Sequence, residues 1–367
     1  MGKVRVGING YGVIGKRVAA AVAQQDDMML AGICDIVTDY RIRMPWVLGI
    51  PVYAATEDAA LALREAGITP KGVLPDLLEH VDVIVDCTPK SVAAKNLPLY
   101  REHKVKFILQ GGEKHETSGH SFVAQANYES ALDRESTRVV SCNTTATVRL
   151  LASLQEAGLV KRARGTLMRR ATDPWESHVS GIMNTVVPEP DIPSHQGPDA
   201  KTILKNLDIV TVACKVPETI GHVHYWWVEL AKPVDRNAVL ALLRTTPRVV
   251  LADPAFALDT PNAIKEFMLD LGRPRGDLWE VCVWEHLVQV QGSELYWSHF
   301  VDNQAIVVPE NIDAIRALTG IERDGRASIK KTDQSMSSGW SEPKRPFARN
   351  ASEGECQGHA LHGSKSD

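Results

Sequence analysis

The sequence lacks a long hydrophobic segment and an excess of either charge. No apolar run approaches the roughly 18 residues that cross a membrane, so we expect no membrane partner. Lys and Arg number 41 against 45 for Asp and Glu, and the net charge of −4 gives no general attraction to nucleic acid or anionic lipid. A strand-like segment, Val4–Asn9, follows Met1 closely. We therefore expect no signal peptide and a cytoplasmic protein.

Cysteine is also sparse. The 367 residues include six cysteines and no Cys-x-x-Cys pair, so we expect reduced thiols rather than a disulfide framework. We find no spacing of ligands that is typical of a metal site, and we expect no metal. The cysteines stand at positions 34, 87, 142, 214, 282 and 356.

The first 140 or so residues alternate short apolar runs with helical patterns. Strands separated by helices need crossover connections, which favours a mainly parallel sheet covered on both faces. The expected strands are Val4–Asn9, Met29–Cys34, Val81–Asp86, Val105–Leu109 and Arg138–Ser141. The expected helices are Val13–Gln25, Leu74–Glu79 and Val92–Glu102.

The pattern changes after Cys142, where longer β-rich segments predict an α+β unit with an antiparallel or mixed sheet. Gly292-Ser293 is typical of a tight hairpin turn between the last two of these segments. The β-rich segments are Gly165–Arg170, Asp208–Val216, Val223–Ala231, Glu280–Gln291 and Glu294–Val301. Helices are expected at Thr145–Ala157, Asn237–Arg244 and from Pro309 to about Leu318.

A glycine-rich segment lies between the first expected strand and the first expected helix. Gly10–Gly15 has the spacing G-x-G-x-x-G, and this context is the one in which the motif binds a dinucleotide. Glycines allow a tight turn and a close approach of the pyrophosphate, and the helix start supplies unpaired N–H groups. Asp35 follows Gly15 by 20 residues, where a carboxylate can accept hydrogen bonds from the ribose hydroxyls. The alternative is a glycine-rich turn without a ligand.

Cys142 stands at another junction between a strand and a helix, in the segment Ser141-Cys142-Asn143-Thr144-Thr145. A helix N-terminus stabilises negative charge, so we expect the pKa of the Cys142 thiol to be lowered. Backbone N–H groups at the helix start could also bind an oxyanion beside the sulfur. The alternative is a buried structural cysteine.

These residues carry a resemblance to a known family. Ser141-Cys142-Asn143-Thr144-Thr145 is similar to the active-site signature of glyceraldehyde-3-phosphate dehydrogenases. Further segments resemble the archaeal-type (type II) branch, in consistent order from about residue 3 to 337. They are Asn9–Gly12 with Gly15–Arg17, Gln110–Lys114, Arg169-Arg170, Pro193–His195 and Val307–Ala314.

The resemblance implies phosphorylating oxidation of D-glyceraldehyde 3-phosphate to 1,3-bisphosphoglycerate, with inorganic phosphate and NAD or NADP, in glycolysis or gluconeogenesis. It also implies a homotetramer. The expected fold class is α/β, with a Rossmann-type dinucleotide-binding domain of residues 1–141 plus 309–337 and a catalytic domain of residues 142–308. The composition becomes rich in Ser, Gly, Lys and Pro from about Lys330, so we expect the last 30 or so residues, 338–367, to be disordered. The resemblance offers no counterpart for these residues.

By resemblance Cys142 is the nucleophile, forming a thiohemiacetal and then a thioester, and His222 is the base. His is the usual base near neutral pH. In a strand, positions 222 and 224 share a face, so spacing alone does not separate His222 from His224. A metal site is the other interpretation of His-x-His, but further ligands at suitable spacing are missing.

The remaining site residues are also implied by the resemblance. Arg169 and Arg170 are neighbours on an expected strand, so we expect only one of them to line the site. The substrate-binding residues expected are Ser141, Cys142, Asn143, His195 and Gln196. The cofactor-binding residues expected are Gly10, Gly12, Val13, Ile14, Gly15, Asp35, Gly112, Arg170 and Asn303.

Three positions depart from the family pattern. Gln196 stands where relatives often carry a second His, and Asn303 stands where they carry Gln. Asp35 replaces residues suited to a 2′-phosphate, so NAD is the preferred cofactor and NADP the alternative. Two other functions stay open, namely a related dehydrogenase of the aspartate-semialdehyde type and a catalytically silent NAD-binding sensor.

Overall fold

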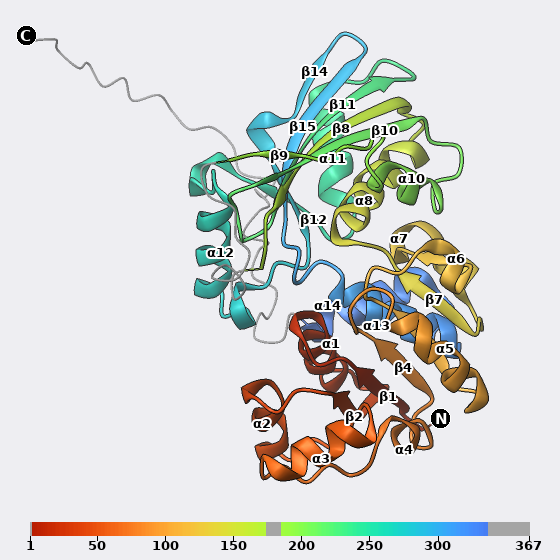
Figure 1. Cartoon of the computed structure of the whole chain (residues 1–367). Coiled ribbons are helices and arrows are strands. Elements are labelled where there is room, and N and C mark those ends of the chain that lie inside the picture. Colours follow the sequence, from red (N-terminus) through yellow and green to blue (C-terminus); the bar gives the residue numbers. More distant parts are fainter. Residues whose placement is uncertain (1, 174–184, 337–367) are drawn as a thin grey trace, which may run out of the picture.

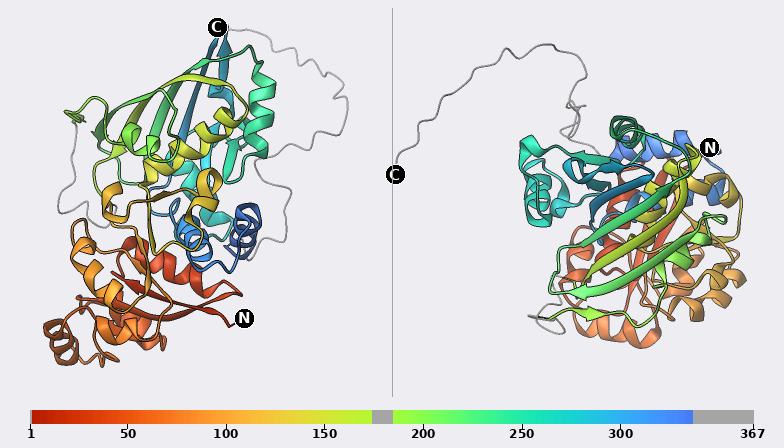
Figure 2. Two further views of the ribbon diagram at one scale, coloured as in Figure 1. Left: turned by 90° about the vertical axis from the view of Figure 1, so that its right-hand side faces the viewer. Right: turned by 90° about the horizontal axis from the view of Figure 1, so that it is seen from above.

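The computed structural model describes residues 2–173 and 185–336, which form two β-sheets with helices packed against them (Figure 1). Viewed from the side, the sheets are stacked one above the other, with the N-terminal sheet below (Figure 2). The predicted α/β fold class is confirmed. The predicted tail of residues 338–367 lies outside the described residues.

The N-terminal sheet has seven strands in the order β3-β2-β1-β4-β5-β7-β6, and every pairing in it is parallel. The order 3-2-1-4-5 is that of a Rossmann fold, whose ligands bind at the carboxyl ends of the strands. The strands are β1 (Val4–Asn9), β2 (Met28–Asp35), β3 (Val52–Ala54), β4 (Val83–Asp86), β5 (Lys106–Leu109), β6 (Ser121–Phe122) and β7 (Ser136–Val139).

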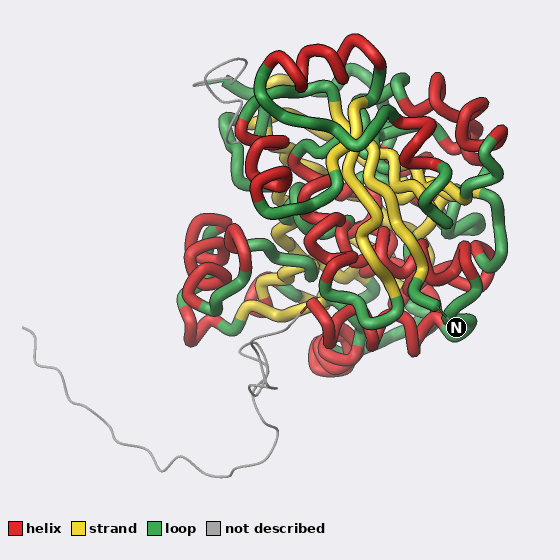
Figure 3. The backbone as a smooth tube through the Cα atoms, turned by 90° about the horizontal axis from the view of Figure 1, so that it is seen from below, coloured by secondary structure: helices red, strands yellow, loops and turns green. Residues whose placement is uncertain are grey.

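Helices flank this sheet on either side (Figure 3). Two of them come from the C-terminal end of the described chain, where α13 packs on α1 and on α14. The helices are α1 (Val13–Ala23), α2 (Tyr40–Val47), α3 (Glu57–Glu65), α4 (Leu74–Leu78), α5 (Ala93–Glu102), α6 (His115–Ser118), α7 (Ala124–Asn127), η1 (Tyr128–Ala131), α13 (Val308–Thr319) and α14 (Gly325–Met336).

The second sheet has eight strands and is mixed, with α8, α10 and α11 packed against it. The strands are β8 (Val160–Arg170), β9 (Val187–Pro188), β10 (Ile209–Val216), β11 (His222–Leu230), β12 (Val249–Ala252), β13 (Val281–Trp284), β14 (Gln289–Gln291) and β15 (Glu294–Val301). The helices are α8 (Cys142–Glu156), α10 (Gln196–Lys201), α11 (Arg236–Thr245), η3 (Pro254–Phe256), α12 (Pro261–Asp270), η4 (Pro274–Gly276) and η5 (Glu285–Leu287).

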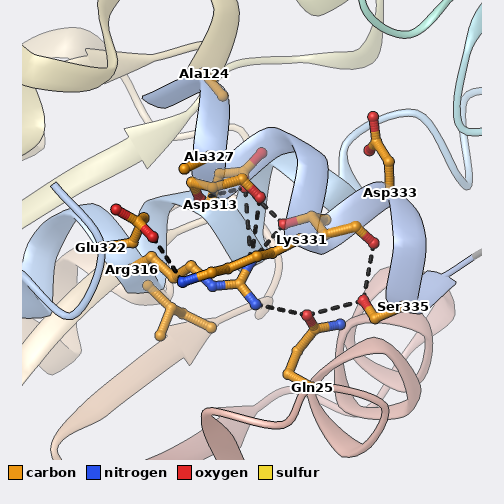
Figure 4. A network of polar contacts seen from close by, with 12 residues as sticks. Gln25, Ala124, Asp313, Arg316, Glu322, Ala327, Lys331, Asp333 and Ser335 are labelled. Carbon is orange, nitrogen blue, oxygen red and sulfur yellow. Dashed lines mark hydrogen bonds and ion pairs between the residues drawn. The ribbon is translucent and has the colours of Figure 1, made fainter. Parts of the chain in front are cut away.

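The C-terminal helices are fastened by buried charged groups (Figure 4). Arg316 on α13 donates to Asp27 at 2.8 Å and to Gln25 at 2.7 Å, and both acceptors flank the entry to β2. Ser328 and Thr332 on α14 donate to Asp313 at 2.7 and 2.6 Å. Buried hydroxyl groups thus hold the polar helix α14 in place against α13.

The described ranges contain neither a membrane-spanning helix nor a cluster of metal-binding side chains. Within residues 2–173 and 185–336, no helix is long and apolar enough to cross a membrane. The same residues contain no group of three or more His, Cys, Asp or Glu side chains arranged to hold a metal ion.

Candidate active site

The glycine loop lies at the carboxyl end of β1, and each glycine answers a different steric demand. Gly10 has a left-handed φ of +89°, and a Cβ there would lie 2.8 Å from backbone atoms of residues 87 and 88. A Cβ on Gly15 would lie 1.9 Å from the Gly10 carbonyl oxygen, so only glycine lets α1 pack on the loop. Gly12 faces open space and caps α1 without a side-chain hydrogen bond. The first turn of α1, with Val13 and Ile14, therefore fits a pyrophosphate.

Asp35 ends β2 beside this loop. Its carboxylate accepts the Tyr11 N–H at 2.6 Å and the Ile36 N–H at 2.7 Å, so it helps to hold the loop. A carboxylate has about four acceptor positions, which leaves capacity for ribose hydroxyls. Two nearby cations are engaged elsewhere: Arg41 pairs with Asp39 at 2.6 Å, and Arg43 donates to the carbonyl of residue 66 at 2.8 Å.

Gly112 lies beyond the carboxyl end of β5. It has a φ of +87° and an open Cβ position. Its neighbour Gly111 has no room for a side chain, because a Cβ would lie 2.0 Å from the Thr88 carbonyl oxygen after β4. The loops after β1, β2, β4 and β5 thus meet at one edge of the parallel sheet, as expected for a dinucleotide site.

Cys142 is the first residue of α8. Ser141 caps the helix by accepting the Thr144 N–H at 3.3 Å. The pKa of the Cys142 thiol is nevertheless raised, because burial disfavours the thiolate more than Arg170, Arg169 and the Asn143 backbone N–H favour it. The predicted lowering of this pKa is therefore wrong, since the loss of water around the half-buried thiol outweighs the helix start.

His222, at the start of β11, faces the sulfur. Its Nε2 lies 3.3 Å from Cys142 Sγ, while Nδ1 accepts the Arg170 backbone N–H at 3.0 Å. In the neutral imidazole the proton is therefore assigned to Nε2, which points it at Sγ. Burial is the largest cause that holds the pKa of His222 well below its usual value. The nearby His224 and the two arginines lower this pKa further. The resting pair is thus neutral.

His224 is directed differently. Its Nε2 lies 2.8 Å from Asn143 Oδ1, and its Nδ1 lies 3.0 Å from His299 Nε2. The structure thus separates two histidines that strand periodicity could not, because only His222 contacts Cys142 Sγ.

The two arginines at the end of β8 point to different partners. Arg169 pairs with Glu189, and Arg170 pairs with Asp173 at 3.2 Å. Both cations nevertheless act on the same thiol, since each of them lowers the pKa of Cys142. At the partly buried end of β8, side chains that point to opposite faces of the strand can therefore both affect Cys142.

Asp173 connects Arg170 to the expected nicotinamide contact. Its Oδ1 accepts from Asn303 Nδ2 at 3.0 Å and from Gln304 Nε2 at 3.2 Å. Asn303 Oδ1 is buried without a hydrogen-bond partner within the described ranges, so an acceptor is left over for a ligand such as a carboxamide. Sequence reasoning missed Asp173, since a lone carboxylate in a loop gives no signal.

A second missed contact fastens α1 to the loop before β13. Arg17 Nη2 lies 2.9 Å from Asp277 Oδ1 and 2.9 Å from Gln304 Oε1, and both charged side chains are almost fully buried. The glycine-loop helix and the segment with Asn303 are therefore held together. Residues 260 positions apart form this pair, so no local pattern could reveal it.

His195 and Gln196 begin α10, which packs against α8. The His195 side chain is exposed. Gln196 is fully buried, and among the described residues neither its Nε2 nor its Oε1 has a partner. Arg138 on β7 fixes this helix through Asp199 at 2.9 Å.

The sequence matches two family models. Residues 141–260 match "Glyceraldehyde 3-phosphate dehydrogenase, C-terminal domain", and residues 4–117 match "Dihydrodipicolinate reductase, N-terminus". The first match contains Cys142 and His222, and the second contains the glycine loop.

Curated relatives match over nearly the whole chain. Glyceraldehyde-3-phosphate dehydrogenase from Hyperthermus butylicus is 45% identical, covering 92% of this chain and 98% of the relative. The protein of that name from Methanothermobacter thermautotrophicus is 43% identical, with 91% and 99% covered. The one from Thermococcus kodakarensis is 45% identical, with 91% and 98% covered.

A solved structure shares the fold. Aspartate semialdehyde dehydrogenase II from Vibrio cholerae, in a complex with ASA, superposes with a TM-score of 0.59. The match covers 87% of this chain and 99% of that one at 16% identity, which supports the architecture alone.

Proposed function

Because the chain belongs to the glyceraldehyde-3-phosphate dehydrogenase family, we propose that it oxidises D-glyceraldehyde 3-phosphate with a nicotinamide cofactor and inorganic phosphate, giving 1,3-bisphosphoglycerate. The observation that carries this proposal is the 3.3 Å contact between Cys142 Sγ and His222 Nε2 at a helix start. A nucleophile beside a proton-handling group is the arrangement that covalent catalysis requires. We propose that this reaction serves glycolysis or gluconeogenesis.

The proposed cofactor site follows the glycine loop. Gly10, Gly12 and Gly15, with Val13 and Ile14, receive the pyrophosphate. Asp35 holds the ribose, and Gly112, Arg170 and Asn303 lie toward the nicotinamide. The open space at Gly12 and the unpaired Oδ1 of Asn303 support this assignment. When bound, the nicotinamide accepts a hydride from the substrate carbon. Residues 1–141 with 309–337 form the proposed cofactor domain and residues 142–308 the catalytic domain.

In the proposed reaction, Cys142 Sγ attacks the aldehyde carbon and forms a carbon–sulfur bond. The carbonyl oxygen becomes the oxygen of a thiohemiacetal, and hydride loss from that carbon leaves a thioester. A phosphate oxygen then attacks the thioester carbon, the carbon–sulfur bond breaks, and the electron pair returns to Sγ. The covalent intermediate divides one difficult step into two.

His222 handles the proton at this centre in our proposal. In the resting site Nε2–H points at Sγ, where it stabilises a developing thiolate and then the thiohemiacetal oxygen. The Arg170 backbone N–H occupies Nδ1 and keeps the ring in this tautomer. When the thiohemiacetal forms, the thiol proton passes to the carbonyl oxygen. As the hydride leaves, Nε2 can take that proton only in the other neutral tautomer, with the ring proton on Nδ1. The base role expected from the family therefore requires the ring to exchange tautomers and to lose the hydrogen bond from the Arg170 N–H.

The phosphate group of the aldehyde and the inorganic phosphate both need cations and hydrogen-bond donors close to Sγ. We propose that Ser141, Asn143, His195 and Gln196 contact the substrate, and the unpaired buried amide of Gln196 supports its part. Arg169 and Arg170 add positive charge beside the sulfur.

We further propose NAD as the preferred cofactor, a cytoplasmic location and a homotetramer. The engagement of Arg41 with Asp39 and of Arg43 with a carbonyl supports the cofactor preference, because a 2′-phosphate would meet Asp35 instead. A hollow of about 420 Å³ on the second sheet supports self-association, since aromatic side chains line it and Tyr225 is 49% exposed there.

Initial rates test the proposed function. The protein should reduce NAD in the presence of glyceraldehyde 3-phosphate and phosphate, and much more slowly without phosphate. Turnover of aspartate semialdehyde instead would favour the rival dehydrogenase. The absence of turnover with either aldehyde, despite NAD binding, would favour the silent sensor.

A further inference from the structure

Four buried side chains behind the nucleophile form one hydrogen-bonded chain. Trp297 Nε1 lies 3.1 Å from His299 Nδ1, and His299 Nε2 lies 3.0 Å from His224 Nδ1. His224 Nε2 lies 2.8 Å from Asn143 Oδ1. His224 and His299 are paired across β11 and β15, with ring centroids 4.7 Å apart. The chain thus runs from the middle of the second sheet to the start of α8.

The first member gives the chain a direction. An indole N–H can only donate, so His299 Nδ1 must accept and its proton must be on Nε2. His299 Nε2–H then donates to His224 Nδ1, which places the His224 proton on Nε2, facing Asn143. Burial lowers the pKa of His224 to about 3, so the ring is neutral and the direction is kept at physiological pH.

The direction matters because a carboxamide has two unlike ends. With His224 Nε2–H as donor, Asn143 must present its oxygen to His224. Among the hydrogen bonds within residues 2–173 and 185–336, the Asn143 side chain takes part only in this one, so its amide nitrogen stays available to a ligand. With the opposite His224 tautomer, the amide would turn over and leave its oxygen on the free side.

Asn143 follows Cys142 in the first turn of α8, and the parallel contacts of His222 and His224 hold the two residues side by side. We infer that Trp297, His299 and His224 are positioning residues that present the Asn143 amide N–H, rather than its oxygen, to the oxyanion formed when Sγ bonds to the aldehyde carbon. The inference rests on the proposed function, because the oxyanion belongs to that reaction. A preorganised N–H donor at such a place stabilises the transition state without reorganisation.

Two tryptophans offer a matched test. Trp226 lies opposite Trp297, stacked at 6.0 Å between ring centroids, and both are nearly buried. The Trp226 indole N–H has no hydrogen-bond partner within the described ranges. Trp297→Phe and Trp226→Phe therefore remove the same atoms, but only the first removes the donor that starts the chain.

We expect Trp297→Phe to lower kcat about tenfold or more while KM for the aldehyde stays within about twofold, because a donor to an oxyanion acts in the transition state. Trp226→Phe should keep kcat within about twofold. Equal losses in the two variants would overturn the inference, since both would then reflect packing.

His299 gives a rescue test that does not depend on tryptophan. Gln can accept on Oε1 and donate from Nε2, so His299→Gln preserves the direction of the chain, whereas His299→Leu breaks it. We expect most of kcat to remain in the Gln variant and about a tenfold loss in the Leu variant. Equal losses would refute the positioning role.

Alkylation of Cys142 by iodoacetamide separates this inference from the proposed function, because it needs no substrate. His299→Leu should slow alkylation severalfold relative to His299→Gln, since the disordered amide no longer stabilises negative charge beside Sγ. Equal alkylation rates would count against the inference. A wild-type protein without phosphate-dependent turnover would instead refute the proposed function.

Discussion

Replacing Asp35 should change the choice of cofactor. Asp35→Asn keeps an acceptor for the Tyr11 N–H, which lies 2.6 Å from the carboxylate, but removes the charge. A 2′-phosphate adds about two negative charges, as other phosphate esters do. At a separation of about 6 Å from a carboxylate, the repulsion energy of each of these charges is about 0.7 kcal/mol in bulk water. It is about 2.8 kcal/mol at a dielectric constant near 20.

The site is half-buried, so the total penalty falls between about 1.4 and 5.5 kcal/mol. The lower limit already corresponds to about a tenfold preference for NAD in kcat/KM. Asp35→Asn should restore most of the kcat/KM that NADP loses beside the carboxylate. It should weaken NAD binding by about tenfold or more, because a hydrogen bond to a charged group is worth about 1.5–3 kcal/mol.

The assay is kcat/KM for both cofactors at saturating aldehyde and phosphate. Asp39→Asn is a useful partner variant, because it removes the negative charge that pairs with the Arg41 guanidinium yet keeps an N-cap for α2. This variant should raise kcat/KM for NADP without lowering kcat/KM for NAD. Equal or better efficiency with NADP in the unmutated protein would refute the reasoning, and would point to Arg41 as a phosphate ligand.

Four further predictions concern the catalytic pair and the buried contacts around it. Cys142→Ser should retain NAD binding but less than about a hundredth of turnover, since an alcohol is a much weaker nucleophile. His222→Asn should slow hydride transfer about a hundredfold and His224→Asn much less; in single-turnover measurements, the reverse ranking would move the proton-handling role to His224. Because burial raises the pKa of Cys142, alkylation of the free protein should keep rising with pH beyond about 8.5, the usual cysteine value, and a midpoint below it would contradict the burial argument. Glu310→Gln should destabilise the fold by about 3–5 kcal/mol in urea unfolding, because it leaves Arg149 charged and fully buried; a loss below about 1 kcal/mol would show that the pair is dispensable.

Local patterns in the sequence predicted much of the fold. The strand at Val4–Asn9 was placed to the residue, and the helix expected from Pro309 to Leu318 is α13. The Gly292-Ser293 hairpin is present, with Gln291 paired to Glu294. These elements carry their own signals, in apolar periodicity and turn residues.

Other features depend on tertiary contacts and could not be predicted. The β-rich segment Glu280–Gln291 is interrupted by η5, and α14 is a polar helix that forms because its hydroxyl groups are buried against Asp313. The pKa of Cys142 depends on burial, which outweighs the effect of the helix start. Sequence motifs identified the residues of the candidate site, but not the hydrogen bonds that select the tautomer of His222.

The central claim is that oxidation proceeds through a thioester on Cys142. Rapid mixing of the protein with NAD and glyceraldehyde 3-phosphate in phosphate-free buffer tests it most directly. The account predicts a burst of NADH stoichiometric with protein, an acyl group on the Cys142 peptide by mass spectrometry, and steady turnover once phosphate is added. A burst that persists in Cys142→Ser, or turnover that never depends on phosphate, would contradict it.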